Sequence, residues 1–398
     1  MHPPPGAMPN FAGSIGSYIT QIQTLSSYDD DSVDRLNYVY TTYILLSLTL
    51  TLFATNYVGE PLQCWVPKQF TDIWEAFAES YCFVENTYFV PMNDTNLPLA
   101  YTREDREMIY YQWVPFILLV MGFFFWLPRT FWKIFATYRG LAIADLVSTA
   151  KSAAKDFADT KKIDELDKAR YAFNHTLFVA QEVSRTKMTK YGSQLYNLFI
   201  IKKILILINL VLQFFLINQY LGTAYTFWGA GIFWDMLNGR QWQESGHFPR
   251  VAFCDFTVRE LGNVNNWTVQ CVLMVNMFNE KIFIFLWFWF AALLIITFMN
   301  TLIWLHRRMS SENRHEFLVA LLSFAQAQGH EDGSAVDSFY QKVLNNDGVL
   351  VLRLMDSNSG RFLTADFAKK LWYASHPMLA SPNQSTELAN EETSRKEV

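Results

Sequence analysis

Four long stretches without a charged side chain constrain this chain more than any other feature of its 398 residues. Roughly 18 or more consecutive residues of this kind are typical of a bilayer span, because a helix rising about 1.5 Å per residue then crosses the roughly 30 Å hydrocarbon core. A core helix of a soluble protein keeps a polar face instead. The stretches are Leu36–Gly59, Met108–Pro128, Ile204–Trp234 and Ile282–Leu305. We therefore predict an all-α membrane protein, a four-transmembrane-helix bundle.

Lys and Arg are distributed unevenly between the segments that the four spans separate. Of the 32 basic residues, 25 lie in the leader (1–35), the middle loop (129–203) and the tail (306–398). The loops 60–107 and 235–281 hold the other seven. Because cytoplasmic segments carry the excess of basic residues, both termini and the middle loop are expected in the cytoplasm.

All four cysteines lie in the two loops assigned to the outside. Cys64 and Cys82 belong to the first loop, and Cys254 and Cys271 belong to the second. An oxidising compartment favours disulfides, so two bonds are expected. Three pairings are possible, and the residues alone leave the choice open.

Two glycosylation sequons lie in the same outer loops, at Asn93 and Asn266. They would be open to glycosylation if the orientation is right. The sequons at Asn174 and Asn383 lie in segments assigned to the cytoplasm and should stay unmodified.

The residues at the start of the second span carry a family resemblance. "YYQWVP", with Tyr110, Tyr111, Gln112, Trp113 and Pro115, resembles the signature of the innexins, the gap-junction proteins of invertebrates. Blocks in both outer loops and in the tail are similar to innexin blocks in the same order. They are "GEPLQCWVPKQF", "SYCFVENTYFVP", "FPRVAFCDFTVRELGNVNNWTVQCVLMVNMFNEKIFIFLWFWF" and "DGVLVLRLM".

This resemblance implies a subunit of a large-pore channel that passes ions and small molecules between adjacent cells. It implies a plasma-membrane gap junction, an octameric ring of the same or other innexin subunits, contact with lipid, and docking to a ring of the neighbouring cell. It also implies the pairing Cys64–Cys271 and Cys82–Cys254, which would brace the docking loops. No nucleic-acid partner is expected.

The leader contains an amphipathic helical pattern, because apolar residues recur at three- and four-residue spacing. They are Phe11, Ile15, Tyr18, Ile19 and Ile22. The resemblance implies that this helix enters the pore as a funnel. A helix lying on the inner leaflet is the alternative.

The second span begins with aromatic residues that are typical of the membrane interface. Tyr110, Tyr111 and Trp113 are expected to anchor its outer end, and Pro115 should kink the helix near Tyr111. The proline is either a gating hinge or simply a tolerated residue.

The cytoplasmic segments are expected to form a helical dome, and the third span should extend outside the membrane. Within 306–376 the sequence predicts helices over Glu312–Gln328 and Thr364–Tyr373, and a strand-like run over Val349–Leu354. The last segment, 377–398, is polar and predicted to be disordered.

No enzymatic activity, metal or cofactor is expected, since the seven His show no zinc spacing and no phosphate-binding glycine loop occurs. Two alternatives to the docked channel stay open. One is an undocked hemichannel that opens to the outside, and the other is a four-span adhesion or scaffold protein.

Overall fold

The computed structural model describes residues 29–138 except 86, 91–96, 100–102, 104–106 and 109, then 193–221, 231 and 248–376. Within these residues, four helical segments are long and apolar enough to cross a membrane. They are Ser32–Tyr57, Tyr110–Ala136, Gln194–Ile217 and Met274–Met309. The prediction of a mostly helical four-span protein is confirmed.

The chain divides into two compact units, and three of its long helices contribute to both. The first unit comprises 1–36, 128–205 and 298–398, and the second comprises 37–127 and 206–297. The long helices are α6 (Tyr110–Tyr138), α10 (Gln194–Leu221) and α12 (Met274–Met309). The first span is formed by α2 (Ser32–Arg35), the π-helical turn η1 (Leu36–Tyr40) and α3 (Thr41–Tyr57).

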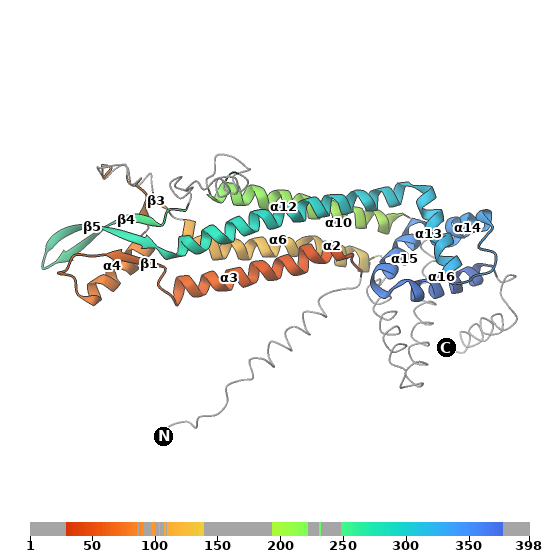
Figure 1. Ribbon diagram of the computed structural model, residues 1–398, viewed down its shortest axis with the longest axis horizontal. Helices are drawn as coiled ribbons and strands as arrows, with labels where there is room; N and C mark the ends of the chain where they lie inside the picture. Colours follow the sequence, from red (N-terminus) through yellow and green to blue (C-terminus); the bar gives the residue numbers. More distant parts are fainter. Residues whose placement is uncertain are drawn as a thin grey trace, which may run out of the picture. The chain divides into compact units, whose positions relative to one another are not determined.

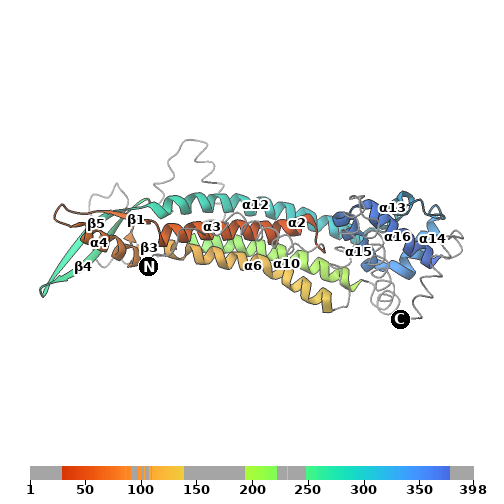
Figure 2. The same ribbon diagram turned by 90° about the horizontal axis from the view of Figure 1, so that it is seen from below.

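In the second unit, α3 and the adjoining parts of α6, α10 and α12 run alongside one another (Figures 1 and 2). Aromatic side chains fill the contacts between them. Phe53 packs on Phe116 at a centroid distance of 5.2 Å, and Phe125 packs on Phe290 at 5.4 Å. A bundle of apolar helices is the form in which every backbone polar group is satisfied inside a bilayer.

The loops that follow the first and third spans fold into a five-stranded antiparallel sheet, which the sequence did not predict. Its order is β1-β5-β4-β2-β3, and helix α4 (Asp72–Val84) belongs to the same core. The strands are β1 (Leu62–Trp65), β2 (Thr87–Tyr88), β3 (Glu107–Met108), β4 (Val251–Glu260) and β5 (Asn263–Leu273). Strands of the first loop therefore flank the hairpin of the second loop on both sides.

Most described residues of the first unit are helical, and none of them forms a strand. Four helices and a π-helical turn follow α12 there, in agreement with the predicted helical dome. They are α13 (Ser311–Phe324), α14 (Gly333–Phe339), η5 (Tyr340–Leu344), α15 (Asn345–Ser359) and α16 (Arg361–Ser375).

The strand predicted over Val349–Leu354 is wrong, because these residues lie in the middle of α15. Every residue from Asp347 to Met355 is buried. A helix that is covered on all sides has no polar face, so its sequence lacks the period that distinguishes a helix from a buried strand.

Several predicted features lie outside the described residues. Among them are the funnel residues Phe11, Ile15, Tyr18, Ile19 and Ile22, the sequon at Asn93, most of the middle loop, the extension of the third span beyond 221, and the tail from 377 onward.

Candidate functional site

Two disulfides join the two outer loops into one structure. Cys64 on β1 is directly opposite Cys271 on β5 in the strand register, and the two are bonded. Cys82 on α4 is bonded to Cys254 on β4. This is the pairing that the family resemblance implied, and each bond links one loop to the other.

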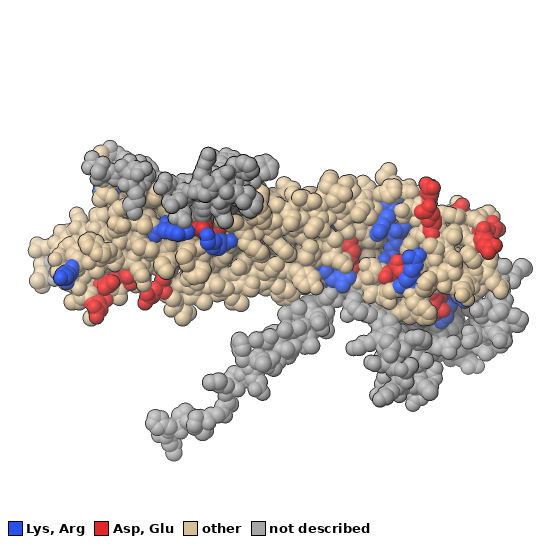
Figure 3. All heavy atoms as spheres, viewed as in Figure 1, with Lys and Arg blue, Asp and Glu red and all other residues tan. Residues whose placement is uncertain are grey.

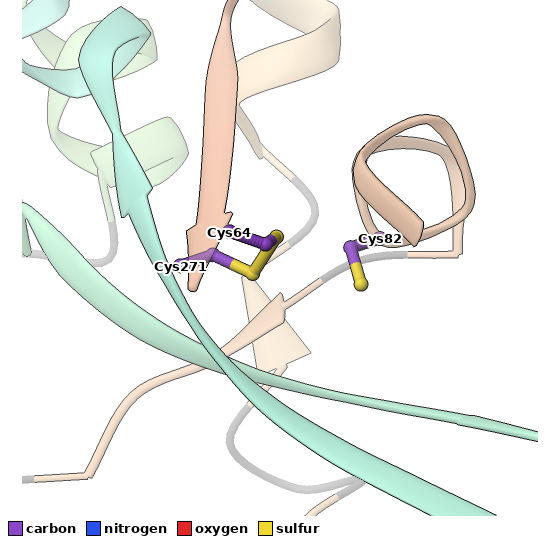
Figure 4. Close-up of side chains that lie close together, drawn as sticks. All are labelled: Cys64, Cys82 and Cys271. Carbon is purple, nitrogen blue, oxygen red and sulfur yellow. A yellow bond between two sulfur atoms is a disulfide. The ribbon is translucent and has the colours of Figure 1, made fainter. Parts of the chain in front are cut away.

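The two disulfides lie next to each other in the buried core of the sheet. Figure 4 shows the Cys64–Cys271 bond between β1 and β5, with Cys82 extending from α4 beside it. The sulfur atoms of these three residues lie within 4.8 Å of one another. Because all four cysteines are oxidised in disulfides, none of them offers the thiolate that a metal ion would need.

The start of α6 is attached to the end of α4. Gln112 donates from Nε2 to the carbonyl oxygens of Phe83 and Val84, at 2.5 and 3.2 Å. These carbonyls belong to the last turn of α4, where no intrahelical donor remains to satisfy them. Gln112 thus caps α4 and fixes it against the first residues of a predicted membrane span.

The aromatic residues of the same stretch have different surroundings from those expected. Tyr111 is fully buried, donates to the Phe83 carbonyl at 3.4 Å and packs on the Phe83 ring. It therefore belongs to the core of the loop structure and is not an anchor in the lipid interface. Trp113 is 56% exposed, and its place at the membrane interface stays a prediction. Helix α6 continues unbroken through Pro115, so a hinge there stays a prediction.

Asp255 on β4 gathers polar side chains from three parts of the loops. Its carboxylate accepts hydrogen bonds from Thr268 on β5 at 2.6 Å and from the Tyr88 hydroxyl at 3.2 Å, and it pairs with Arg103 at 2.5 Å. Burial and the Asp255 charge raise the pKa of Tyr88 to about 12. The tyrosine is therefore a neutral donor at every physiological pH.

The hairpin of β4 and β5 ends in a turn that is open to solvent. Leu261 is fully exposed at φ 48° and Gly262 follows at φ 89°. Asn266 lies further along β5, exposed and opposite Thr257, whose hydroxyl donates to its side chain at 3.1 Å. The sequon asparagine of the second loop therefore lies on an accessible strand face.

A buried charge cluster holds the residues that precede the first span to the long helices. Asp30 pairs with Arg129 at 2.6 Å and with Lys202 at 2.5 Å. Asp34 pairs with Lys202 at 2.7 Å and with Lys203 at 2.6 Å. All these contacts lie within the first unit, and they connect the leader with α6 and α10.

Asp31 completes this cluster. It accepts from Lys203 at 2.5 Å and from the Trp304 ring nitrogen at 2.7 Å, and it caps α2 through the Asp34 amide. Burial would raise the pKa of Asp31, but the Lys203 ammonium outweighs it and holds that pKa well below the usual range. Asp31 therefore stays charged at physiological pH.

Sequence reasoning missed two of these arrangements. The acidic run from Asp29 to Asp31 forms no recognisable motif, and Lys202 and Lys203 contributed only to the count of basic residues in the middle loop. The one available signal was their position immediately before two apolar spans. Gln112 was noticed as part of the signature, but its acceptors lie 28 and 29 residues away.

Comparison with known proteins gives a consistent result. The Innexin family model matches residues 30–375. Innexin-16 of Caenorhabditis elegans is 55% identical over 361 residues, which cover 90% of this chain and 93% of that protein. Innexin eat-5 of the same organism is 37% identical over 383 residues, covering 90% and 89%. Innexin unc-9 is 38% identical over 361 residues, covering 86% and 92%.

Proposed function

The chain belongs to the innexin family, and on this premise we propose how its parts serve a gap-junction channel. The protein is a subunit of an oligomeric large-pore channel of the plasma membrane, which passes ions and small molecules between adjacent cells. The main observation that supports the roles proposed below is the five-stranded sheet of the two loops. Both loops contribute strands to it, and two disulfides lock it.

The sheet and α4 form the surface that docks to a ring of the neighbouring cell. Docking requires a surface whose shape is set before contact, because ordering a mobile loop would reduce the binding free energy. The disulfides, the Gln112 cap and the contacts of Asp255 all reduce the freedom of this surface. The exposed turn at Leu261 and Gly262 is the part of the hairpin best placed to reach a partner.

Both termini, the middle loop and residues 306–376 lie in the cytoplasm. The excess of Lys and Arg in these segments supports this orientation, as does the oxidised state of all four cysteines in the opposite loops. Labelling of intact cells with a membrane-impermeant reagent at an introduced Leu261→Cys should succeed. The same reagent should not reach an Arg361→Cys variant.

The leader forms the cytoplasmic funnel of the pore. Its amphipathic pattern supports this role, and so does the fixed point that the cluster of Asp30, Asp31 and Asp34 provides just before the first span. Deletion of Met1–Leu25 should change single-channel conductance or ion selectivity. Unchanged permeation in a correctly assembled ring would favour a helix on the inner leaflet.

The ring is an octamer that forms from this chain alone or with other innexins. The mass of the purified ring in a detergent micelle decides the subunit number. Co-purification with a tagged relative, such as an innexin-16 expressed in the same cell, decides whether mixed rings form.

Paired-cell electrophysiology with dye transfer tests the docked channel. Two cells that both express the protein should be coupled, and dye should pass between them. Absence of coupling with normal surface expression, together with dye uptake by single cells, would favour a hemichannel. Absence of both activities from a purified and assembled ring would favour a scaffold.

The exposed position of Asn266 gives the hemichannel a specific test. A glycan on this strand would stand on the docking surface and hinder contact between rings. If the site is occupied, Asn266→Gln should increase coupling between paired cells without changing single-cell currents. Equal coupling before and after the change would show that this residue does not limit docking.

A further inference from the structure

A second group of basic side chains lies in the first unit, and it differs from the buried charge cluster. We call it the arginine cluster: Arg307 and Arg308 in the last turn of α12, Arg314 in the first turns of α13, and Arg353 in α15. Arg308 lies over the Tyr196 ring, and Arg307 lies over Trp304, which packs on Tyr196 at a centroid distance of 6.3 Å. Arg314 donates to the Arg308 carbonyl at 2.6 Å, and Arg353 donates to Asn313, the residue before Arg314. Figure 3 shows Lys and Arg side chains on this unit, with Asp and Glu side chains between them.

The arginine cluster has no carboxylate partner among the described residues. Lys202, Lys203 and Arg129 make ion pairs at 2.5 to 2.7 Å, whereas none of the four arginines makes one with a described residue. Asp356 attracts Arg353 electrostatically but is not paired with it. Within the described part of the chain, carboxylates thus neutralise the buried lysines, whereas the arginine cluster has no such partner.

Aromatic rings hold these guanidinium groups in place. Arg307 lies over Trp304 at 5.3 Å, Arg308 over Tyr196 at 5.9 Å and Arg314 over Tyr340 at 4.9 Å. A ring face positions a guanidinium group through a cation–π contact and leaves its N–H edges free to donate. Among the residues that the structure describes, the side chains of Arg307 and Arg308 donate no hydrogen bond.

Arg353 shows the electrostatic cost of the arrangement. It is 92% buried, packs over Phe317 and donates to Asn313, but its Nε has no hydrogen-bond partner among the described residues. Burial and the neighbouring charges of Arg307 and Arg314 lower the pKa of Arg353 to about 10. A buried cation with an unused donor is costly unless an anion reaches it.

Helix dipoles explain only part of the arginine cluster. Arg307 and Arg308 are favourable at the C-terminal end of α12, where the carbonyl groups carry partial negative charge. Arg314 is placed at the start of α13, where the same effect opposes a positive charge and favours an anion. Arg353 is in the middle of α15, where neither end acts on it.

The position along α12 indicates the source of the anion. The helix qualifies as a membrane span up to Met309, and Met299, Ile303 and Met309 expose apolar surface on it. Basic residues in the last turn of such a span lie at the depth of lipid headgroups, and clusters of them on the cytoplasmic side bind anionic lipids.

We propose that the arginine cluster is a binding site for a phosphate-bearing anion, supplied by the headgroup of an anionic phospholipid of the inner leaflet. The planar N–H edges of Arg307 and Arg308 bind phosphate oxygens in pairs, as guanidinium groups do. Arg314, which donates from Nη1 to the Arg308 carbonyl, contributes its remaining N–H groups. Arg353, which is buried in α15, adds positive charge to the site. The bound headgroup compensates the charge of the cluster and connects α12, α13 and α15.

Binding to the purified full-length ring tests this site. The probes are dioctanoyl phosphatidylinositol bisphosphate, dioctanoyl phosphatidylcholine and soluble inositol trisphosphate. The variant is Arg307→Gln with Arg308→Gln and Arg314→Gln, which leaves the buried Arg353 in place. The matched control removes the same charge elsewhere in the unit, by Lys342→Gln with Arg361→Gln and Lys369→Gln.

We expect the anionic lipid to bind the unaltered ring and phosphatidylcholine not to bind. The arginine variant should lose about tenfold or more in affinity, and the control about twofold or less, because several charge-assisted contacts are removed only in the former. A variant with Lys at the three positions keeps the charge but not the paired donors, so its affinity should be intermediate. It also separates binding from folding, since it preserves the electrostatics of the surface.

The soluble headgroup distinguishes the two sources of phosphate. Weak binding of inositol trisphosphate beside tight binding of the lipid supports a lipid site. Equal binding of both supports the phosphate site but assigns it to a soluble ligand. The proposal is overturned if neither binds, as expected if an acidic segment of the chain occupies the cluster, or if the arginine variant and its control lose affinity equally.

Discussion

The ammonium group of Lys203 lies 2.5 Å from the Asp31 carboxylate and 2.6 Å from that of Asp34, and all three side chains are buried. A span that begins with paired charges is fixed in position along its axis, because moving it would separate the charges in a medium that cannot solvate them. Here the pairs connect the start of the first span with the first half of α10.

Replacement of Lys203 by Met should therefore destabilise the protein strongly. It leaves two buried carboxylates with one cation fewer, which costs about 3–5 kcal/mol in unfolding free energy. The added change Asp31→Asn should restore part of the loss, because it removes one uncompensated charge. Denaturant unfolding of the purified ring measures both, and Lys342→Met at an exposed position of η5 is the control.

The same pair sets a pH dependence. Since the pKa of Asp31 is lowered by folding, its contribution to stability is complete above the ordinary value of 3.8 and is lost as the pH falls below it. The contribution of Asp31 to the unfolding free energy should therefore be constant between about pH 5 and pH 8.

Tyr88 predicts the opposite response, in strong alkali. Its folded-state pKa is about 12, against an ordinary value of 10.0, so the unfolded chain releases this proton first. The stability of the loop structure should therefore fall as the pH rises from about 10 to 12. Tyrosinate absorbance should reveal a late-titrating group that disappears in Tyr88→Phe. A variant that titrates like the unaltered protein would contradict the assignment.

The cap of α4 can be tested at Gln112. Gln112→Leu removes both hydrogen bonds to the last carbonyls of the helix and should cost about 1–3 kcal/mol, since the bond to the Phe83 carbonyl is partly buried. Hydrogen exchange of the peptide that covers Asp72–Val84 should become faster. The neighbouring change Trp113→Phe, at a largely exposed side chain, should leave this exchange unaltered.

Removal of the bond between α4 and β4 should separate docking from pore formation. Cys82→Ser with Cys254→Ser should lower stability by about 2–4 kcal/mol in the usual loop-entropy model, while the Cys64–Cys271 bond keeps the sheet connected. Coupling between paired cells should drop more than the current of single cells. An equal drop in both would mean that the bond serves assembly in general.

The four spans could be predicted because a helix that crosses a bilayer needs a long stretch of apolar residues, and such stretches can be recognised in a single sequence. The helices around Glu312 and Thr364 were predictable for a similar reason, since their exposed faces give the sequence a period. The helix at Val349–Leu354 was not, because burial on all sides removes that period.

The loop sheet and the charge clusters were beyond reach for another reason. Asp30 and Lys202 are 172 residues apart, and no local pattern relates them. Tyrosine is a residue type typical of the membrane interface, but Tyr111 is buried because it packs on Phe83 of α4. In each case the role of the residue depends on a contact with a residue far away in the sequence, and no local pattern predicts that contact.

The interleaving of strands in the outer sheet restricts how this protein can be recombined with its relatives. The hairpin of β4 and β5 is hydrogen-bonded on one side to β1 and on the other to β2, both from the first loop. A chimera that exchanges one loop alone would pair strands of two different proteins at both the β1–β5 and the β2–β4 interface. Partner choice between cells should therefore be inherited by the two loops as a single module, and only a double exchange should transfer it intact.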